Sequence, residues 1–156
     1  MAEYSAIEAQ TINPGGSAVF TATVVLPESD YIQHYDGTST FLLSGFDDYN
    51  IGCCCPCMRN TGVNYMAFFS ANIAVASTGT AGEISVAYSI AGATDPGSVM
   101  QVTPAAVSEF WNVSCAKSIS IFRNCCQTVT ITNTSDQPIV MQNANLILLP
   151  PGGTFN

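Results

Sequence analysis

The sequence predicts an all-β protein, folded as an antiparallel sandwich or jelly roll. The strongest signal is a two-residue alternation of apolar residues from Val63 to Val75, which resumes from Ile84 to Ile90. Alternation with this period is typical of strands that place one face on a core. Turn residues separate about eight or nine such segments, and no stretch shows a helical period of comparable strength. Many short strands between turns indicate a sandwich or jelly roll.

The two strongest alternating segments are expected to pair with each other. The glycine-containing stretch 77–82 lies between them and breaks the alternation. Two strands around such a loop predict a long antiparallel hairpin or an adjacent pair. In the first segment, the other half of the alternation points toward something more polar and consists of Asn64, Met66, Phe68, Ser70, Asn72, Ala74 and Ala76.

The other elements are assigned from alternation and from turn residues. Before the pair, we expect an N-terminal arm at 1–12, a turn at 13–16, strands at 18–26 and 38–43, a polar loop at 31–37 and an irregular insertion at 45–60. After it, we expect a turn at 92–97 and strands at 99–102, 107–113, 118–122, 128–132 and 139–149.

The last of these strands is predicted to be central in its sheet. From Leu146 onward both of its faces are apolar, which suits a strand that is covered on both sides, and Pro150 then stops it. A chain of 156 residues is long enough for one domain with a sizeable core. The predicted organisation is therefore an arm at 1–12, a single jelly-roll domain at 13–150 and a C-terminal tail at 151–156.

The charge of the chain excludes some classes of partner. Eleven acidic and three basic residues give a formal net charge of −8, which argues against binding to nucleic acid or to an anionic membrane surface. Charged residues make up only 9% of the chain, against about 25% in typical soluble domains. Subunits of shells, fibres and tight oligomers often have this composition, and so do secreted β-domains. Neither a secretory signal nor a membrane-spanning run is recognised, so synthesis in a cytoplasm is expected.

Six of the seven cysteines form two groups, Cys53, Cys54, Cys55 and Cys57, and Cys125 and Cys126. An odd number excludes a fully paired intrachain framework, and neighbouring thiols rarely bond to each other. The groups could supply thiolates to a structural zinc or iron–sulfur centre, or join copies of the chain. Contiguous cysteines fit the usual CxxC spacing poorly, and a reduced or variably oxidised loop is the alternative. No other cofactor is expected, and Cys115 is predicted to pack as a small hydrophobe.

Few other residues suggest chemistry. His34 is the only histidine and could be a general base or a ligand, but an exposed loop histidine is favoured. A hydrolase with a cysteine nucleophile would need a thiol within hydrogen-bond reach of His34. Asp47, Asp48 and Asn50 could hold calcium, although a solvated acidic turn is favoured. No GxSxG, P-loop, HExxH or GxGxxG motif is present, and we expect a protein that is not an enzyme.

Phe110 and Trp111 are adjacent in a predicted strand. Successive side chains of a strand point to opposite faces, so one ring is expected in the core and the other toward a partner or solvent. For the outward ring, an interface contact is slightly favoured over a carbohydrate platform.

Two resemblances follow from longer stretches. "NYMAFFSANIAV" and "TAGEISVAYSIAGATDPGS" are similar to the pattern of trimeric jelly rolls of the tumour-necrosis-factor and complement-head type, which include the C-terminal domain of exosporium glycoproteins. That resemblance implies a homotrimer. The collagen-like repeats of exosporium proteins are missing from this sequence.

"MQVTPAAVSEFWNVS" and "RNCCQTVTITNTSDQPIVMQNANLILL" resemble an uncharacterised family encoded in gut Firmicutes, often in phage or prophage settings. This resemblance implies a virion structural protein made in the host cytoplasm: a capsid decoration, head-fibre or tail-associated jelly roll. Its partners would be copies of itself and other capsid or tail proteins. The alternative is a surface module that recognises a host glycan or protein.

Overall fold

The computed structural model describes residues 1–27, 30–45, 58–123 and 125–151. Within these ranges the only helix is the short 3-10 turn η1 (Pro96–Ser98), and none is long and apolar enough to cross a membrane. The strands are β1 (Ala2–Ala6), β2 (Gln10–Ile12), β3 (Ala22–Val25), β4 (Ile32–Gln33), β5 (Phe41–Ser44), β6 (Met58–Val75), β7 (Ile84–Ile90), β8 (Ala93–Thr94), β9 (Met100–Val102), β10 (Trp111–Arg123), β11 (Cys126–Asn133) and β12 (Ile139–Leu149).

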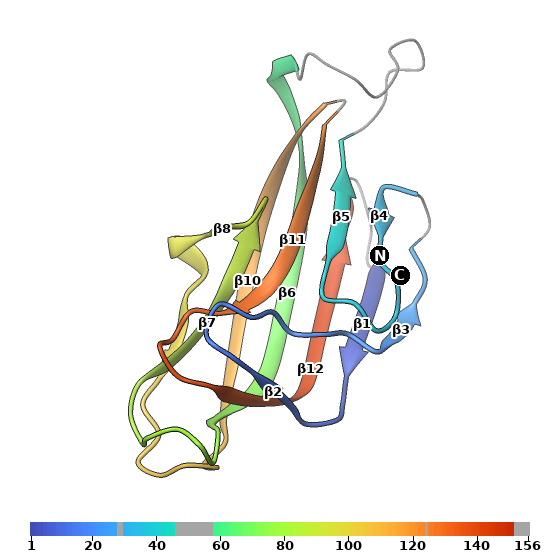
Figure 1. Cartoon of the computed structure of the whole chain (residues 1–156). Helices are drawn as coiled ribbons and strands as arrows, with labels where there is room; N and C mark the ends of the chain where they lie inside the picture. Colours follow the sequence, from blue (N-terminus) through green and yellow to red (C-terminus); the bar gives the residue numbers. More distant parts are fainter. Residues whose placement is uncertain (28–29, 46–57, 124, 152–156) are drawn as a thin grey trace.

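The strands form two antiparallel sheets that face each other (Figure 1). One sheet, called sheet A, has the order β10-β6-β12-β1-β3, with β2 also paired to β12. The other, sheet B, has the order β4-β5-β11-β7-β8, with β9 also paired to β7. The inward side chains of both sheets form one buried cluster that includes Tyr4, Phe41, Tyr65, Phe69 and Tyr88. The predicted all-β, antiparallel sandwich is confirmed.

The expected pairing of the two strongest strands is wrong. β6 pairs with β10 and β12 in sheet A, whereas β7 pairs with β11, β8 and β9 in sheet B. The loop between β6 and β7 therefore carries the chain from one sheet to the other. Alternation shows only that one face of a strand is buried. Two strands meet that condition equally well when they face each other across a core.

The last strand, β12, is central, as predicted, because it pairs with β6, β1 and β2. Its alternation is interrupted by a bulge between Gln142 and Asn145. Asn143 lies there with a φ of 51° and is exposed. The extra residue shifts the phase of the strand by one position. Met141 before the bulge and Ala144 after it both face the core as a result.

Residues 1–12 do not form an arm. β1 inserts between β12 and β3, and β2 pairs with the start of β12. Ala2, Tyr4 and Ala6 are buried in the core. The pattern of this segment is weak because the apolar residues on its inward face are mostly small or polar-tipped.

One long strand replaces two that were expected, at 107–113 and 118–122. β10 pairs with β6 from Trp111 to Arg123, and residues 103–110 lie outside the strands. The carboxylate of Glu109 accepts hydrogen bonds from the backbone N–H groups of Ala105 and Ala106 at 2.9 and 3.1 Å. Such an acceptor closes a turn in the chain just before β10 begins.

The two ends of β6 mark the two ends of the sandwich. At one end, Met58 pairs with Arg123, and the N–H of Gly45 donates to the carbonyl of Cys125 at 2.7 Å. We call this the cysteine end. At the other end, Val75 leads into the loop to β7, which lies beside the connection from β11 to β12. We call this the loop end.

Candidate functional site

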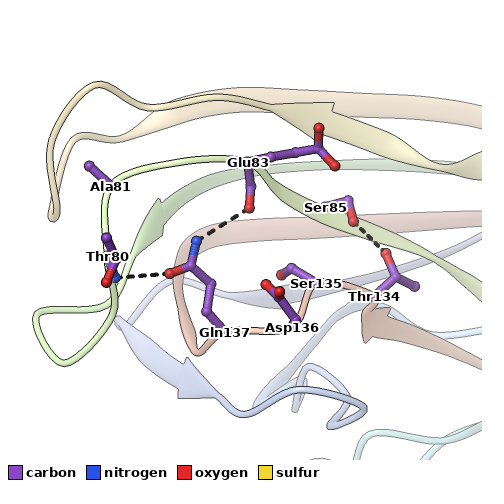
Figure 2. Close-up of a pocket in the computed structure, with 8 residues that line it drawn as sticks. All are labelled: Thr80, Ala81, Glu83, Ser85, Thr134, Ser135, Asp136 and Gln137. Atoms are coloured by element: carbon purple, nitrogen blue, oxygen red, sulfur yellow. Dashed lines mark hydrogen bonds between the residues drawn. The ribbon is translucent and has the colours of Figure 1, made fainter.

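The loop end carries a polar depression of about 760 Å³ between two of the connections that cross from one sheet to the other (Figure 2). One wall is the β6–β7 loop with the start of β7, and the other is the β11–β12 connection. Hydroxyl, amide and carboxyl groups dominate its lining, which consists of Thr80, Ala81, Glu83, Ser85, Thr134, Ser135, Asp136 and Gln137.

The polar groups of this depression bond mainly to one another. The Gln137 side chain accepts from the N–H of Thr80 at 2.9 Å and donates to the carbonyl of Glu83 at 3.3 Å (Figure 2). The hydroxyls of Ser85 and Thr134 lie 2.7 Å apart across the two walls. These hydrogen bonds hold the β6–β7 loop against the β11–β12 connection. We call this group of hydrogen bonds the latch.

Asn133 supports the latch from inside. Its side chain is fully buried, and its amide nitrogen donates to the carbonyls of Ile12 and Gln137, both at 2.9 Å. Its amide oxygen accepts from the backbone N–H of Ser135 at 2.9 Å and from the Ser135 hydroxyl. One side chain thus joins the β2 segment to the β11–β12 connection. The sequence did not predict a structural role for Asn133 or Gln137, because nothing local distinguishes a buried amide from a solvated one.

Gly79 lies in the β6–β7 loop at a position where an added side chain would be too close to its neighbours. A Cβ atom there would lie 2.7 Å from Val75 Cγ1 and 2.9 Å from Gln137 Oε1. Val75 is buried and cannot move aside freely. We expect Gly79→Ala to lower the free energy of unfolding by about 1–3 kcal/mol, measured by urea denaturation. Gly97→Ala is the matched control, because its Cβ would meet only the ends of two side chains, Lys117 Nζ at 3.2 Å and Asp95 Oδ1 at 3.4 Å. Equal stability of the two variants would contradict the close contact.

The outer face of sheet A is a second candidate surface, and we call it the uncharged face. It is formed by the outward side chains of three neighbouring strands, β10, β6 and β12. These are Asn64, Met66, Phe68, Ser70 and Asn72 on β6, Asn112, Ser114, Ala116, Ser118 and Ser120 on β10, and Gln142, Asn145, Ile147 and Leu149 on β12. None of these side chains is charged. A shallow depression of about 300 Å³ lies at its centre, around Phe68, Ala116 and Ile147.

Polar side chains on the uncharged face form hydrogen bonds with side chains of neighbouring strands. Asn112 donates to Asn72 at 3.2 Å, Ser120 donates to Asn64 at 2.5 Å, and Asn145 donates to the Glu3 carboxylate on β1 at 2.8 Å. A polar group that is already hydrogen-bonded within the chain costs less free energy to remove from water than an unpaired one. This face can therefore be covered at a lower cost than its polar composition suggests.

His34 is half-buried rather than exposed. Its ring stacks on Phe41 with centroids 4.1 Å apart, and its Nδ1 lies 3.0 Å from the carbonyl oxygen of Thr40. Its Nε2 lies 3.4 Å from the carbonyl oxygen of Phe20. Both ring nitrogens thus face carbonyl groups, and no thiol of the described residues bonds to the ring. The arrangement needed for a cysteine hydrolase is not formed by these residues.

The predicted cysteine ligands are only partly described. Cys53, Cys54, Cys55 and Cys57 lie outside the described residues, as do Asp47, Asp48 and Asn50. Cys125 is buried and disulfide-bonded, so in this state it offers no thiolate. Cys126 is a free, exposed thiol 3.4 Å from the Ser44 hydroxyl. Within the described ranges no three potential ligands gather as a metal site would require.

Two further predictions about side chains can be compared with the fold. Cys115 is half-buried and packs against the core, and desolvation by burial raises the pKa of its thiol. Phe110 and Trp111 are both substantially exposed, so neither ring is the expected core residue. Phe110 precedes β10, and Trp111 is the first residue of that edge strand.

Comparisons with known proteins identify the fold. No family model and no curated protein matches the chain. The globular domain of zebrafish complement 1qA protein is similar, with a TM-score of 0.55 and 11% identity over 94% of each chain. This similarity confirms the jelly-roll fold of the complement-head type and, at that identity, shows the fold alone.

Two weaker similarities are to carbohydrate-binding modules. The CBM35 from Cellvibrio japonicus Abf62 has a TM-score of 0.37 and 8% identity, over 97% of this chain and 99% of that one. The Clostridium thermocellum xylanase 10B CBM22-1-GH10 structure, complexed with xylohexaose, has a TM-score of 0.31 and 11% identity, over 99% of this chain and 27% of that one. These two scores are too low to show a shared fold.

Proposed function

We propose that the protein is a non-enzymatic structural subunit that self-associates through the uncharged face, as a homotrimer. The observation that supports this most directly is the contrast between that face and the rest of the chain. The net charge is −8, yet the outward side chains that form the uncharged face contribute none of it. Copies of an acidic chain repel each other wherever their carboxylates meet. The uncharged face is where two copies can meet without that repulsion.

The composition of the face supports the same proposal. Met66, Phe68 and Ile147 place apolar area at its centre, and serine and asparagine side chains surround them. Interfaces are depleted of charge at their cores and have polar rims. The number of copies, three, is supported by the resemblance to trimeric complement-head domains rather than by the geometry of one chain.

The setting of this assembly is proposed from the second resemblance. It supports a place on a phage particle, as a capsid decoration, head fibre or tail-associated subunit, with other capsid or tail proteins as neighbours. The particle itself tests this setting: mass spectrometry of purified virions is expected to detect the chain in stoichiometric amounts. A chain absent from virions but present in the lysate would contradict it.

Self-association is tested by one charge on the face. Ala116 is exposed on β10 and pairs with Phe68 at the centre of the face. Wild-type protein is expected to have about three times the 16.4 kDa mass of one chain by light scattering. Ala116→Glu is expected to give folded monomers, because the interface would bury the new carboxylate among uncharged side chains with no cation beside it.

The matched control places the same charge on the other sheet. Thr128 is exposed on β11 of sheet B, next to the buried Val129. Thr128→Glu is expected to retain the wild-type mass. A wild-type monomer at micromolar concentration, or equal masses for Ala116→Glu and wild type, would overturn the proposal.

A ligand-binding module is the second candidate function, and one observation favours it. Tyr4, Leu26 and Tyr35 line a separate cavity at the edge of the sandwich, next to His34. This cavity combines aromatic and polar groups, as small-ligand sites do. Binding there is compatible with self-association, because the cavity is built from one chain.

A further inference from the structure

The cavity beside His34 lies where β1, β3 and β4 meet, and its volume is about 360 Å³. Small-ligand sites have volumes of roughly 300–1,000 Å³. Its lining includes Tyr4 from β1, Thr23 from β3, Gln33 from β4, and Leu26 and Tyr35 from the loops that follow these strands. The site is therefore assembled from segments that the fold brings together.

Tyr4 is one of the lining residues, and its buried hydroxyl has no partner. Its side chain is 1% exposed, and its oxygen makes no hydrogen bond in the structure. The ring is fixed by edge contacts with His34 and Phe41, at centroid distances of 4.9 and 4.8 Å. Burial, and secondarily the negative charge of Asp36, raise the pKa of Tyr4 to about 12. The hydroxyl thus stays protonated at neutral pH and is a donor without an acceptor, which buried groups rarely are.

The rim of the cavity is apolar and exposed. Tyr35 is 78% exposed and Leu26 is 77% exposed, and these are the most exposed large hydrophobic side chains of the described residues. Exposed aromatic rings with a polar edge are suited to stacking against a ligand. The largest exposed apolar side chains and the unpartnered hydroxyl thus occur at the same cavity.

The polar groups around the cavity indicate the charge of its ligand. Asp30 lines it, and Asp36 is held beside it by a 2.7 Å hydrogen bond from the Thr23 hydroxyl. Among the described residues that line the cavity there is no lysine or arginine. Carboxylates accept hydrogen bonds from hydroxyl groups and repel anions. A fitting ligand carries hydroxyls that both donate and accept, has an apolar face and has no negative charge.

We propose that this cavity binds one ring of a neutral glycan. Neighbouring sugar hydroxyls donate to the Asp30 or Asp36 carboxylate, and the C–H face of the ring packs on Tyr35. One sugar hydroxyl accepts the hydrogen bond from Tyr4, which requires the exposed rim side chains to move aside because the Tyr4 hydroxyl is itself buried. This assignment deepens the second candidate function, since it names the ligand class and the site, and it does not depend on self-association.

The test is a titration of isotope-labelled protein, followed by NMR, with neutral oligosaccharides of glucose, galactose, mannose and N-acetylglucosamine. At least one is expected to shift amide signals of β1, β3 and β4. Tyr4→Phe keeps the ring and removes only the hydroxyl, and it is expected to weaken binding about tenfold. Tyr35→Ala is expected to weaken it by at least the same factor. Sialyllactose, which is anionic, is expected to bind more weakly than neutral lactose.

Two controls keep the outcome interpretable. Trp111→Ala removes another exposed aromatic ring, outside the cavity, and is expected to bind as wild type does. Ala116→Glu disrupts self-association but leaves the cavity intact, and it is expected to keep full affinity per chain. Failure of the proposed self-association and failure of the proposed glycan binding can then be distinguished. Binding of none of the neutral sugars, preference for the anion or for a peptide, or wild-type affinity of Tyr4→Phe would each overturn the inference.

Discussion

Leu146→Asp is expected to leave the protein largely unfolded. Leu146 is 0% exposed on β12, where it lies opposite Phe69 of β6 and Tyr4 of β1. A carboxylate at this position is buried on the core face with no cation beside it, which costs about 3–5 kcal/mol or more. That is a large part of the ~5–15 kcal/mol that stabilises a typical domain. The measurement is the soluble fraction together with circular dichroism during urea denaturation.

The neighbouring residue provides the control. Ile147 lies on the opposite face of the same strand, within the uncharged face, and is only half-buried. Ile147→Asp is expected to fold and to lose self-association. The same substitution at adjacent positions thus separates the core from the assembly surface. A soluble Leu146→Asp variant that melts within a few degrees of wild type would show that β12 is peripheral.

Asn133→Asp is expected to destabilise the fold by about 3 kcal/mol or more, although it changes almost no volume. The substitution removes both donors from a fully buried side chain and turns an oxygen toward the carbonyls of Ile12 and Gln137. One carboxylate oxygen keeps the two donors of Ser135, but the other faces two carbonyl oxygens without a donor, and a buried charge in that arrangement costs several kcal/mol.

The pH dependence of this variant has a definite sign. Burial near carbonyl oxygens raises the pKa of the new carboxyl above its unfolded value of about 3.9. The variant therefore gains stability relative to wild type as the pH falls below that raised pKa, because the protonated acid can donate one hydrogen bond. Denaturation curves at pH 7 and at about pH 4 check this.

The control for Asn133 makes the same chemical change in solvent. Asn143 is exposed at the bulge of β12, and aspartate also tolerates its positive φ. Asn143→Asp is expected to change stability by no more than about 0.5 kcal/mol. A loss of stability in Asn133→Asp that does not depend on pH, or equal losses of stability in the two variants, would contradict the role given to the buried amide.

The sequence predicted which segments are strands better than it predicted where the strands go. The alternation of β6, of β7 and of each half of β12 is visible because each of these stretches has an apolar inward face. Whether two strands are neighbours in one sheet or face each other across the core leaves no trace in their own pattern. β6 and β7 were paired incorrectly for this reason.

The bulge in β12 illustrates a second limit. A strict two-residue period would place Asn143 and Asn145 on the same face as Met141. The positive φ of Asn143 changes the phase, so that Leu146 and Leu148 face the core instead. Asparagine adopts this conformation more easily than most residues. The residue type is thus a signal, but the same residue also occurs in ordinary polar positions.

Candidate site residues were predictable only where they belonged to a long pattern. The uncharged face is the other half of the alternation in β6, so part of it was visible in the sequence. The cavity beside His34 was not, because Tyr4 lies in a weakly patterned segment and meets Tyr35 only through the packing of three strands. The cysteine groups stood out in the sequence, and Gly45 and Cys125 lie together at the cysteine end.

The direction of β6 gives any ring-shaped assembly a polarity. A trimer with cyclic symmetry relates its subunits by rotation about one axis. If the subunits contact each other along the uncharged face and β6 runs along that axis, every copy of the strand points in the same direction. All three cysteine ends then gather at one pole, and all three loop ends, with Glu83 and Asp136, gather at the other. Of the described residues, Cys125 and Cys126 of each copy would then lie at one pole, and the carboxylates of Glu83 and Asp136 at the other. A trimer of this kind would carry thiol and disulfide chemistry at one end and negative charge at the other.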